Sequence, residues 1–328
     1  MKAYVVEQAG GPEVLKMKDI ASPAPKPHEV KIRVKAFGLN RAEVYRRAGK
    51  MGPISGQVVP GIEAVGEVIE DPAGVLRMGQ RVATAMGGLQ FARNGSYAEE
   101  VTVLRSNVVD LKGVTLAWDE LAALPESYLT VWGALGRLID RAPQQTLLVR
   151  GATSSVGQAG VAYAKALGLT VIATTRSADN AARLKAIGAD AVVIDTGAIA
   201  SEVRAAVPQG VDLALEVVGA STVRDTLKAL RPFGHAVVIG LLGGAPVLES
   251  LDLMNELPQA TRLSFFGSGI LGTPALPLSD APLTWITDRL ASRDIPSLRV
   301  QTFDFDDVQR AHSLIESDRA LGKLVVRV

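Results

Sequence analysis

The chain has 328 residues, with 35 Lys and Arg against 34 Asp and Glu, so its net charge is +1. This length predicts two domains, and the ordinary balance of 48% hydrophobic and 21% charged residues excludes a disordered or collagen-like chain. The small net charge argues against general nucleic-acid binding, and the absence of Cys excludes thiol catalysis, disulfides and Cys-ligated zinc.

Neither the first residues nor any later stretch has the pattern of a signal peptide or a membrane span. The longest apolar stretch, residues 236–248, is interrupted by three glycines and a proline. The spacing of His28, His235 and His312 does not suggest a shared metal. We therefore expect a cytoplasmic protein with no membrane partner.

The first part of the chain, up to about residue 113, has the pattern of short strands and turns. Hydrophobic residues alternate with Lys and Arg over residues 30–36 and Phe37 follows, so residues 30–37 predict a half-buried strand. Residues 66–69 and 79–82 predict further strands bounded by turn residues. This pattern indicates a β-rich domain, in the form of a barrel.

From about Trp118 the pattern changes to apolar strands that alternate with helices. Strands are predicted at 146–150, 170–174, 191–194, 211–217 and 235–239, and helices at 158–167, 180–187, 199–207 and 221–230. Such a succession is typical of a parallel sheet covered on both faces, and it favours the doubly wound dinucleotide-binding fold.

The remaining tail mixes both patterns. Residues 262–270 predict a strand, 282–291 a helix, and 324–328 a final strand, while Asp306 is a candidate cap for a helix over 308–317. This tail is too short for a domain of its own, so we expect it to pack on a domain already formed.

The stretch from Val149 to Gly157 lies between a predicted strand and a predicted helix. Small residues there let the backbone approach a pyrophosphate, and the helix start offers free N–H groups. Of the three usual glycine positions, here Ala152, Ser154 and Gly157, only the last is glycine. The alternative is an ordinary tight turn, but the β–α units that follow favour a cofactor site. The predicted contacts are Ala152, Thr153, Ser154, Ser155, Val156 and Gly157.

The second strand of this region ends in Thr175, Arg176 and Ser177, with no acid before Asp179. An NAD site usually has an acid there, whereas an arginine suits a 2′-phosphate. Ser177 adds a hydroxyl, and Arg183 follows about one helical turn later. These residues favour NADP(H) over NAD(H); the alternative for Arg176 is an arginine of a solvated loop.

Several segments resemble the zinc-independent quinone oxidoreductase branch of the medium-chain dehydrogenase/reductase family. They are GLNRAEVYRRAG (38–49), PGIEAVGEV (60–68), GSYAEEV (95–101), LPESYLTVWGAL (124–135), the turn and the terminal GKLVVRV. The resemblance implies an α/β protein in which a Rossmann doubly wound parallel sheet, residues 119–264, is inserted in a GroES-like β-barrel substrate domain, residues 1–118 plus 265–328. It also implies a homodimer or homotetramer.

Zinc enzymes of this family hold the metal through residues that match Asn40, Ile62 and Glu126 here. Asparagine and isoleucine cannot form a normal zinc site, and the four-cysteine structural lobe is absent. We therefore expect no zinc or other metal, and the arginine after the second strand makes NADP(H) the expected cofactor.

The resemblance implies hydride transfer from NADPH to a quinone or an α,β-unsaturated carbonyl, because these acceptors spread negative charge without a metal. It places Tyr45 as donor of a hydrogen bond or proton, with Asn40 as a second donor. The alternatives are a packed tyrosine, a turn asparagine and protonation of the product by water. Competing functions are an enoyl-thioester or 2-alkenal reductase, a non-catalytic NADP(H)-binding protein and a zinc alcohol dehydrogenase.

Further cofactor contacts carry over from the resemblance. They are Thr130, Val218, Gly219, Gly240, Leu241, Phe266, Gly267, Ser268 and Lys323. The alternative for Lys323 is a surface lysine before an edge strand. Asn180 departs from the family, in which a lysine often supports the 2′-phosphate.

Overall fold

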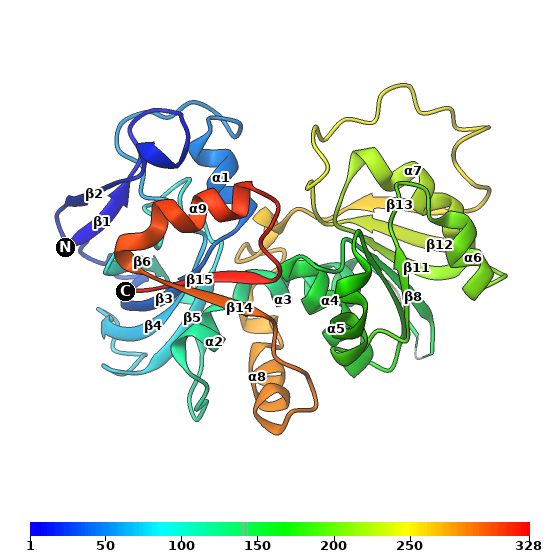
Figure 1. Cartoon of the computed structure of the whole chain (residues 1–328). Helices are drawn as coiled ribbons and strands as arrows, with labels where there is room; N and C mark the ends of the chain where they lie inside the picture. Colours follow the sequence, from blue (N-terminus) through cyan, green and yellow to red (C-terminus); the bar gives the residue numbers. More distant parts are fainter. Residues whose placement is uncertain (140, 143) are drawn as a thin grey trace. The chain divides into compact units, whose positions relative to one another are not determined.

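The computed structural model describes residues 1–139, 141–142 and 144–328, which separate into two compact units (Figure 1). The first unit comprises Met1–Leu129, Gly269–Ala291 and Arg299–Val328, and the second comprises Thr130–Ser268 and Ser292–Leu298. The first unit continues past Trp118 because the helix α2 (Trp118–Ala122) contacts strands of that unit. The assignment of the units as substrate and cofactor domains stays a prediction.

The first unit is built on an antiparallel sheet with one parallel pair. Its described strands follow the order β14-β15-β3-β4-β5-β7, and β6 also pairs with β3. A separate antiparallel pair is formed by β1 (Lys2–Val5) and β2 (Lys16–Asp19). The sheet strands are β3 (Glu29–Gly38), β4 (Glu63–Glu70), β5 (Arg81–Ala85), β6 (Glu100–Leu104), β7 (Val109–Asp110), β14 (Val300–Asp304) and β15 (Lys323–Arg327).

The long strand β3 joins the N-terminal and C-terminal parts of this unit. It pairs with β6 through residues 29–33 and with β15 through residues 36–38. The tail therefore returns to the N-terminal domain, as expected. The helices of the unit are α1 (Arg41–Arg47), α2, the start of α3 (Pro125–Gly133), most of α8 (Leu283–Ser292) and α9 (Val308–Glu316).

One detail of the tail was predicted wrongly. Asp306 does not cap α9, because it lies inside a 3₁₀ turn, Phe305–Asp307, that leads directly into the helix. Asp307 is the N-cap residue, without a side-chain hydrogen bond.

The second unit contains, within the described residues, a six-stranded parallel sheet in the order β10-β9-β8-β11-β12-β13. Counted from β8 this is the order 3-2-1-4-5-6 of the Rossmann fold, so the predicted fold class is confirmed. The strands are β8 (Thr146–Arg150), β9 (Thr170–Thr175), β10 (Ala191–Ile194), β11 (Val211–Glu216), β12 (Leu230–Val238) and β13 (Arg262–Phe265). The helices are α4 (Ser155–Ala166), α5 (Ala181–Ala186), α6 (Ala200–Ala206) and α7 (Ala220–Ala229).

One face of this sheet packs on α6 and α7. Leu148 of β8 and Ala214 of β11 share a buried cluster with Val203 of α6 and Leu227 of α7. On the other face, Gly160 of α4 lies against Val149 and Leu215. The strand order reverses between β8 and β11, and parallel sheets bind ligands at the carboxyl ends of the strands at such a point.

Several predicted boundaries differ from the structure, among them three in the second unit. Helix α4 begins at Ser155, before the predicted Gln158, because the Ser154 hydroxyl accepts a hydrogen bond from the Gly157 amide and caps the helix. Strand β12 begins earlier than predicted, at Leu230, and β13 ends at Phe265. A 3₁₀ turn occupies Ser268–Ile270, which the pattern assigned to the strand.

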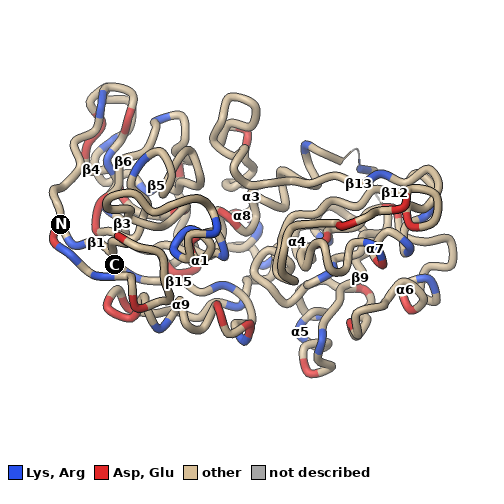
Figure 2. Tube along the Cα trace, turned by 90° about the horizontal axis from the view of Figure 1, so that it is seen from above, with Lys and Arg blue, Asp and Glu red and all other residues tan. Residues whose placement is uncertain are grey.

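Figure 2 shows basic and acidic residues interspersed along the trace of each unit, in keeping with the small net charge. Within the described residues, none of the helices combines the length and the apolar character that crossing a membrane requires.

Candidate functional site

The turn between β8 and α4 has the geometry of a phosphate-binding turn. Gly151 has a φ of +83°, which favours glycine. A Cβ atom on Gly157 would lie 2.3 Å from the carbonyl oxygen of Gly151, so only glycine fits where the helix meets the turn. The amides of Ser155 and Val156 open the helix and therefore have no carbonyl to bind within it. The turn can thus offer free N–H groups to an anion.

Two of the predicted turn residues serve the turn itself. Ala152 is buried, and its amide donates to the Thr174 carbonyl at 3.2 Å. The Ser154 hydroxyl donates to the Gly151 carbonyl at 2.9 Å while it caps α4. Any contact of these two residues with a cofactor would therefore come through the backbone.

Arg176 directly follows β9 and is exposed. Its guanidinium makes no hydrogen bond or ion pair with any residue that the structure describes. The nearby acid Asp179 accepts a hydrogen bond from the Ser177 hydroxyl at 3.1 Å. Asn180 donates to the Thr175 hydroxyl at 3.4 Å. Arg176 is therefore the cation that this loop presents to solvent.

Arg183 lies on the helix that follows this loop, α5. Its Nη2 atom lies 3.4 Å from Oε1 of Gln158 on α4, and the Gln158 amide donates to the Thr153 carbonyl at 2.9 Å. Arg183 is thus linked to the glycine turn through Gln158.

The predicted contacts after β11 and β12 lie together at the carboxyl edge of the sheet. The Glu216 carboxylate accepts hydrogen bonds from the amides of Val218, at 2.8 Å, and Gly219, at 3.0 Å. A Cβ atom on Gly240 would lie 2.4 Å from the Val217 carbonyl oxygen, so these two turns are in close contact. Leu241 follows directly.

The contacts expected after β13 lie beside α3. The Phe266 amide donates to the Val238 carbonyl at 2.9 Å, and its ring fills the space that a side chain on Gly133 would need. Gly267 and Ser268 follow half-buried, and Thr130 is buried in α3. The second unit thus brings most of the predicted cofactor residues to one edge of its sheet.

A buried polar cluster in the first unit contains Asn40 and Lys323. Lys323 is fully buried, and its Nζ atom lies 2.6 Å from Asn40 Oδ1 and 2.5 Å from Glu63 Oε1. Asn40 Nδ2 donates to the same Glu63 oxygen at 2.8 Å. The alternative of a surface lysine is therefore wrong. The Lys323 amine, which the resemblance places near the cofactor phosphates, is bound here by the Glu63 carboxylate.

Of the three positions that match zinc ligands, Asn40 belongs to this cluster, which also includes Glu43, and the other two donate backbone hydrogen bonds to it. The Ile62 amide donates to Glu43 at 3.0 Å and the Glu126 amide to Glu63 at 2.7 Å, while the Asn40 amide group is bound at both ends. Since isoleucine has no ligand atom, this set does not fit zinc. Among the residues described, no three His, Asp or Glu side chains are grouped to hold a metal.

The sequence analysis missed Glu43 and Glu63. Both carboxylates are buried, and Glu63 opens the otherwise mostly apolar strand β4. A charged residue beside a predicted core strand was the available signal, because buried charges require a partner.

Tyr45 lies half-buried on α1, with the Lys50 amine 5.8 Å from the centre of its ring. Burial raises the pKa of the Tyr45 hydroxyl above its ordinary value of 10.0. The phenol therefore carries its proton at neutral pH and can donate a hydrogen bond.

Glu43 makes the stability of the fold depend on pH. Burial raises the pKa of Glu43 to about 7; the nearby Glu63 charge adds to this rise, while backbone N–H groups and Lys323 oppose it. An unfolded glutamate titrates near pH 4.5. Between these two values the folded chain holds a proton that the unfolded chain has released, so the free energy of unfolding falls as the pH rises.

We expect this loss to reach about 3 kcal/mol between pH 4.5 and pH 7, and Glu43→Gln to remove it. Urea unfolding at several pH values measures the slope of the free energy of unfolding against pH. Glu70→Gln is the control, because the Glu70 side chain is 50% exposed and should leave the slope unchanged. Equal slopes for wild type and Glu43→Gln would contradict the prediction.

Two family models match the chain. The model described as alcohol dehydrogenase GroES-like domain matches residues 26–113, and the model described as zinc-binding dehydrogenase matches residues 155–277. The quinone oxidoreductase of Rattus norvegicus is 30% identical over 277 residues, which cover 82% of this chain and 81% of that protein. A 2-haloacrylate reductase of Burkholderia sp is 26% identical over 339 residues, which cover 99% of this chain and 98% of that protein.

Solved structures show the same similarity. A mycobacterial protein solved with NADPH has a TM-score of 0.83 at 26% identity, with 100% of both chains covered. A protein described as an NAD-dependent alcohol dehydrogenase has a TM-score of 0.87 at 28% identity, again with 100% of both chains covered. Together with the Rossmann strand order and the GroES-like unit, these findings show that the chain is an oxidoreductase of the medium-chain dehydrogenase/reductase superfamily, in its quinone oxidoreductase-like branch.

Proposed function

We propose that the protein is an NADPH-dependent, zinc-independent oxidoreductase that transfers hydride to a quinone or an α,β-unsaturated carbonyl. The observation that carries the cofactor choice is Arg176, an exposed arginine without a partner among the described residues, at the end of β9. A guanidinium at this place suits a 2′-phosphate, whereas the ribose hydroxyl of NAD usually meets an acid. The similar mycobacterial NADPH complex supports this choice.

The residues of the second unit fit a dinucleotide. The tight approach at Gly157 and the open start of α4 suit a pyrophosphate, and Val218, Gly219 and Gly240 line the carboxyl edge beside it. When bound, the reduced nicotinamide supplies the hydride. NADH is the second candidate, because one similar structure is described as NAD-dependent.

The substrate class follows from the absence of a fitting zinc ligand set. Hydride transfer to a carbonyl compound leaves negative charge on oxygen, and hydrogen-bond donors must then stabilise that charge. Quinones and conjugated carbonyls spread the charge over several atoms. The relatives named quinone oxidoreductase and 2-haloacrylate reductase support this class.

Tyr45 is the proposed donor to the substrate oxygen. Asn40 is the second candidate, although its Nδ2 atom already donates to Glu63. We expect Tyr45→Phe to lower kcat by roughly 10²–10³-fold, the usual effect of losing one well-placed donor, with the Kd for NADPH unchanged. NADPH oxidation under saturating substrate measures kcat. Tyr4→Phe is the control, because Tyr4 is buried against Phe305. Full activity of Tyr45→Phe would show that the reaction needs no phenol donor.

A screen of NADPH and NADH oxidation across quinones, enones, 2-alkenals and enoyl thioesters tests the function. Turnover of quinones or enones with a preference for NADPH supports the proposal. Turnover of enoyl thioesters or 2-alkenals alone favours the second enzyme class. NADPH binding without any turnover favours a non-catalytic role, and stoichiometric zinc in the purified protein would overturn the zinc-independent assignment.

We also propose a homodimer, with a homotetramer as the alternative. Strand β13 is at the edge of its sheet, and Phe265 at its end is 61% exposed. An edge strand presents unpaired backbone groups that a second copy can cover. Sedimentation equilibrium measures the assembly, and a single species of 34.5 kDa would contradict it.

A further inference from the structure

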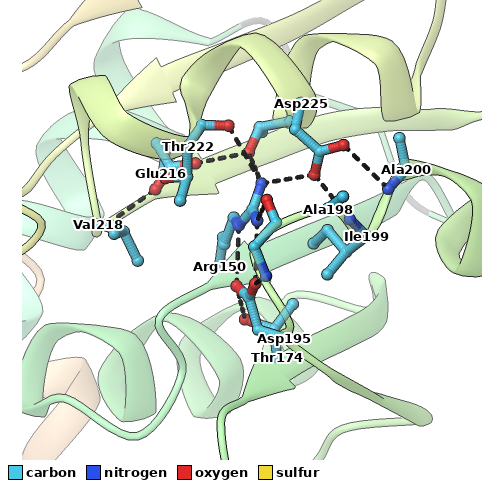
Figure 3. Close-up of polar contacts among 12 residues, drawn as sticks. Arg150, Thr174, Asp195, Ala198, Ile199, Ala200, Glu216, Val218, Thr222 and Asp225 are labelled. Atoms are coloured by element: carbon cyan, nitrogen blue, oxygen red, sulfur yellow. Dashed lines mark hydrogen bonds and ion pairs between the residues drawn. The ribbon is translucent and has the colours of Figure 1, made fainter.

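A row of polar side chains borders the hydrophobic core of the second unit at the carboxyl ends of the strands. Leu148, Ile172 and Ala214 face α6 and α7, and alternate residues of a strand share a face. Two residues further along each strand, at the carboxyl edge, the chain therefore places polar side chains on that same face. They are Arg150, Thr174 and Glu216, joined by Asp195 after β10 (Figure 3).

Arg150 is the centre of this row. Its side chain is fully buried, and its Nε and Nη2 atoms donate to the two oxygens of Asp195 at 2.9 and 3.0 Å. Its Nη1 atom donates to Asp225 at 2.8 Å and lies 3.1 Å from the Thr226 hydroxyl. The carbonyls of Gly197 and Thr222 complete the set, so every N–H group of the guanidinium has an acceptor.

One arm of hydrogen bonds leads from Arg150 to the turn after β11. The Thr226 hydroxyl, which lies beside Arg150 Nη1, donates to Glu216 Oε2 at 2.5 Å. The other Glu216 oxygen accepts the amides of Val218 and Gly219, as described above. The backbone of this turn is therefore held by a buried carboxylate that is itself held by Thr226.

A second arm leads to the glycine turn. The Thr174 hydroxyl lies 3.5 Å from Asp195 Oδ2 and accepts the Gly151 amide at 3.1 Å. Arg150 also directly precedes Gly151 in the chain. One buried guanidinium is thus connected to both turns at the point where the strand order reverses.

We propose that Arg150 is a positioning residue for dinucleotide binding, acting through Asp195 and Thr174 on the glycine turn and through Thr226 and Glu216 on the turn at 218–219. The inference rests on the proposed function, since it assumes that a dinucleotide occupies this edge. Arg150 itself is buried below the turns and donates only to the protein.

Electrostatics supports the same role. Burial alone would raise the pKa of Asp195, but the hydrogen bonds and charge of Arg150 lower it below its ordinary value, so Asp195 is ionised. Without the guanidinium, the partly buried carboxylates of Asp195 and Asp225 would stand unneutralised close to the proposed phosphate-binding turn. Arg150 therefore removes a repulsion that the ligand would otherwise meet.

A purely structural role is the competing explanation. Asp225 also accepts the Ile199 amide at 2.8 Å at the start of α6, so part of the network holds helices together. Buried ion pairs often add little net stability, yet breaking one leaves a costly unpaired charge. The test must therefore separate ligand affinity from stability.

Thr226→Val is the cleanest variant, because it removes one hydroxyl and leaves the contacts of Arg150 with Asp195 and Asp225 in place. We expect the Kd for NADPH, measured by cofactor fluorescence, to rise roughly tenfold, as for the loss of one hydrogen bond to a charged group. Thr287→Val is the matched control. Thr287 is an equally buried helical threonine of the first unit, and its hydroxyl donates to the Thr284 carbonyl at 2.8 Å.

Arg150→Lys extends the series, because an ammonium cannot reach Asp195, Asp225 and Thr226 at once. We expect a rise in Kd of roughly 100-fold, larger than for Thr226→Val. Melting temperatures are measured on the same samples, and each Kd is measured well below the Tm of that variant. Amide hydrogen exchange should be faster at residues 217–219 in Thr226→Val.

The outcomes separate the two proposals. A Kd that rises in Thr226→Val but not in Thr287→Val supports the inference, also when Arg150→Lys does not fold. A lower Tm with an unchanged Kd in Thr226→Val would overturn it and leave the network a structural one. If the wild-type protein binds neither NADPH nor NADH, the proposed function fails, and the inference fails with it.

Discussion

Replacing Arg176 with alanine is expected to raise the KM for NADPH roughly 100-fold and to leave the KM for NADH within about twofold. Arg176 is exposed and has no partner in the described part of the chain, so its guanidinium is available to a 2′-phosphate. NADH lacks that phosphate and loses nothing when the guanidinium is removed.

Steady-state kinetics with both cofactors checks this expectation. Lys228→Ala is the control, because it removes one exposed positive charge from the last turn of α7 in the same unit. Equal changes in the two KM values for Arg176→Ala would remove its assigned role and return NADH to first place.

Gly157→Ala is expected to have the second large effect, a loss of dinucleotide affinity of roughly 100-fold together with a drop in stability of about 1–3 kcal/mol. The new Cβ atom would lie 2.3 Å from the Gly151 carbonyl oxygen and 2.7 Å from Ala152 Cα. Both are backbone atoms, so α4 and the turn must move apart.

The control lies in the same helix. A Cβ atom on Gly160 would meet only side chains, the nearest at 3.2 Å, and alanine is the better helix former. Gly160→Ala should therefore keep its NADPH affinity, measured by fluorescence titration, and its stability in urea. If Gly157→Ala binds NADPH and unfolds like the wild type, the close approach at this turn does not exist in solution.

Much of the second unit could be predicted because its signals are local. Apolar runs bounded by glycine predict buried parallel strands, and Gly168 and Gly188 have φ values of +81° and +117°, as expected after helices. The start of α4 was misplaced because one hydroxyl, that of Ser154, decides where the helix begins.

The polar clusters could not be predicted in the same way. Lys323 and Glu63 are 260 positions apart, and Arg150 is 75 positions from Asp225. Lys323, Glu63 and Arg150 each look like an ordinary charged residue at a strand end, and Asp225 like an ordinary helical one. Only the packing of distant strands and helices brings these charges together and shields them from water.

The sequence by itself determined the order of strands and helices, the turn before Gly157 and the place of Arg176 after β9, because backbone conformation and alternation of side chains depend on neighbouring residues. The tertiary structure alone decided which charged groups are buried and paired, among them Arg150 with Asp195 and Lys323 with Glu63. The reason is physical: a charge is stable in the core only beside its partner, and the partner is chosen by the packing of the whole chain.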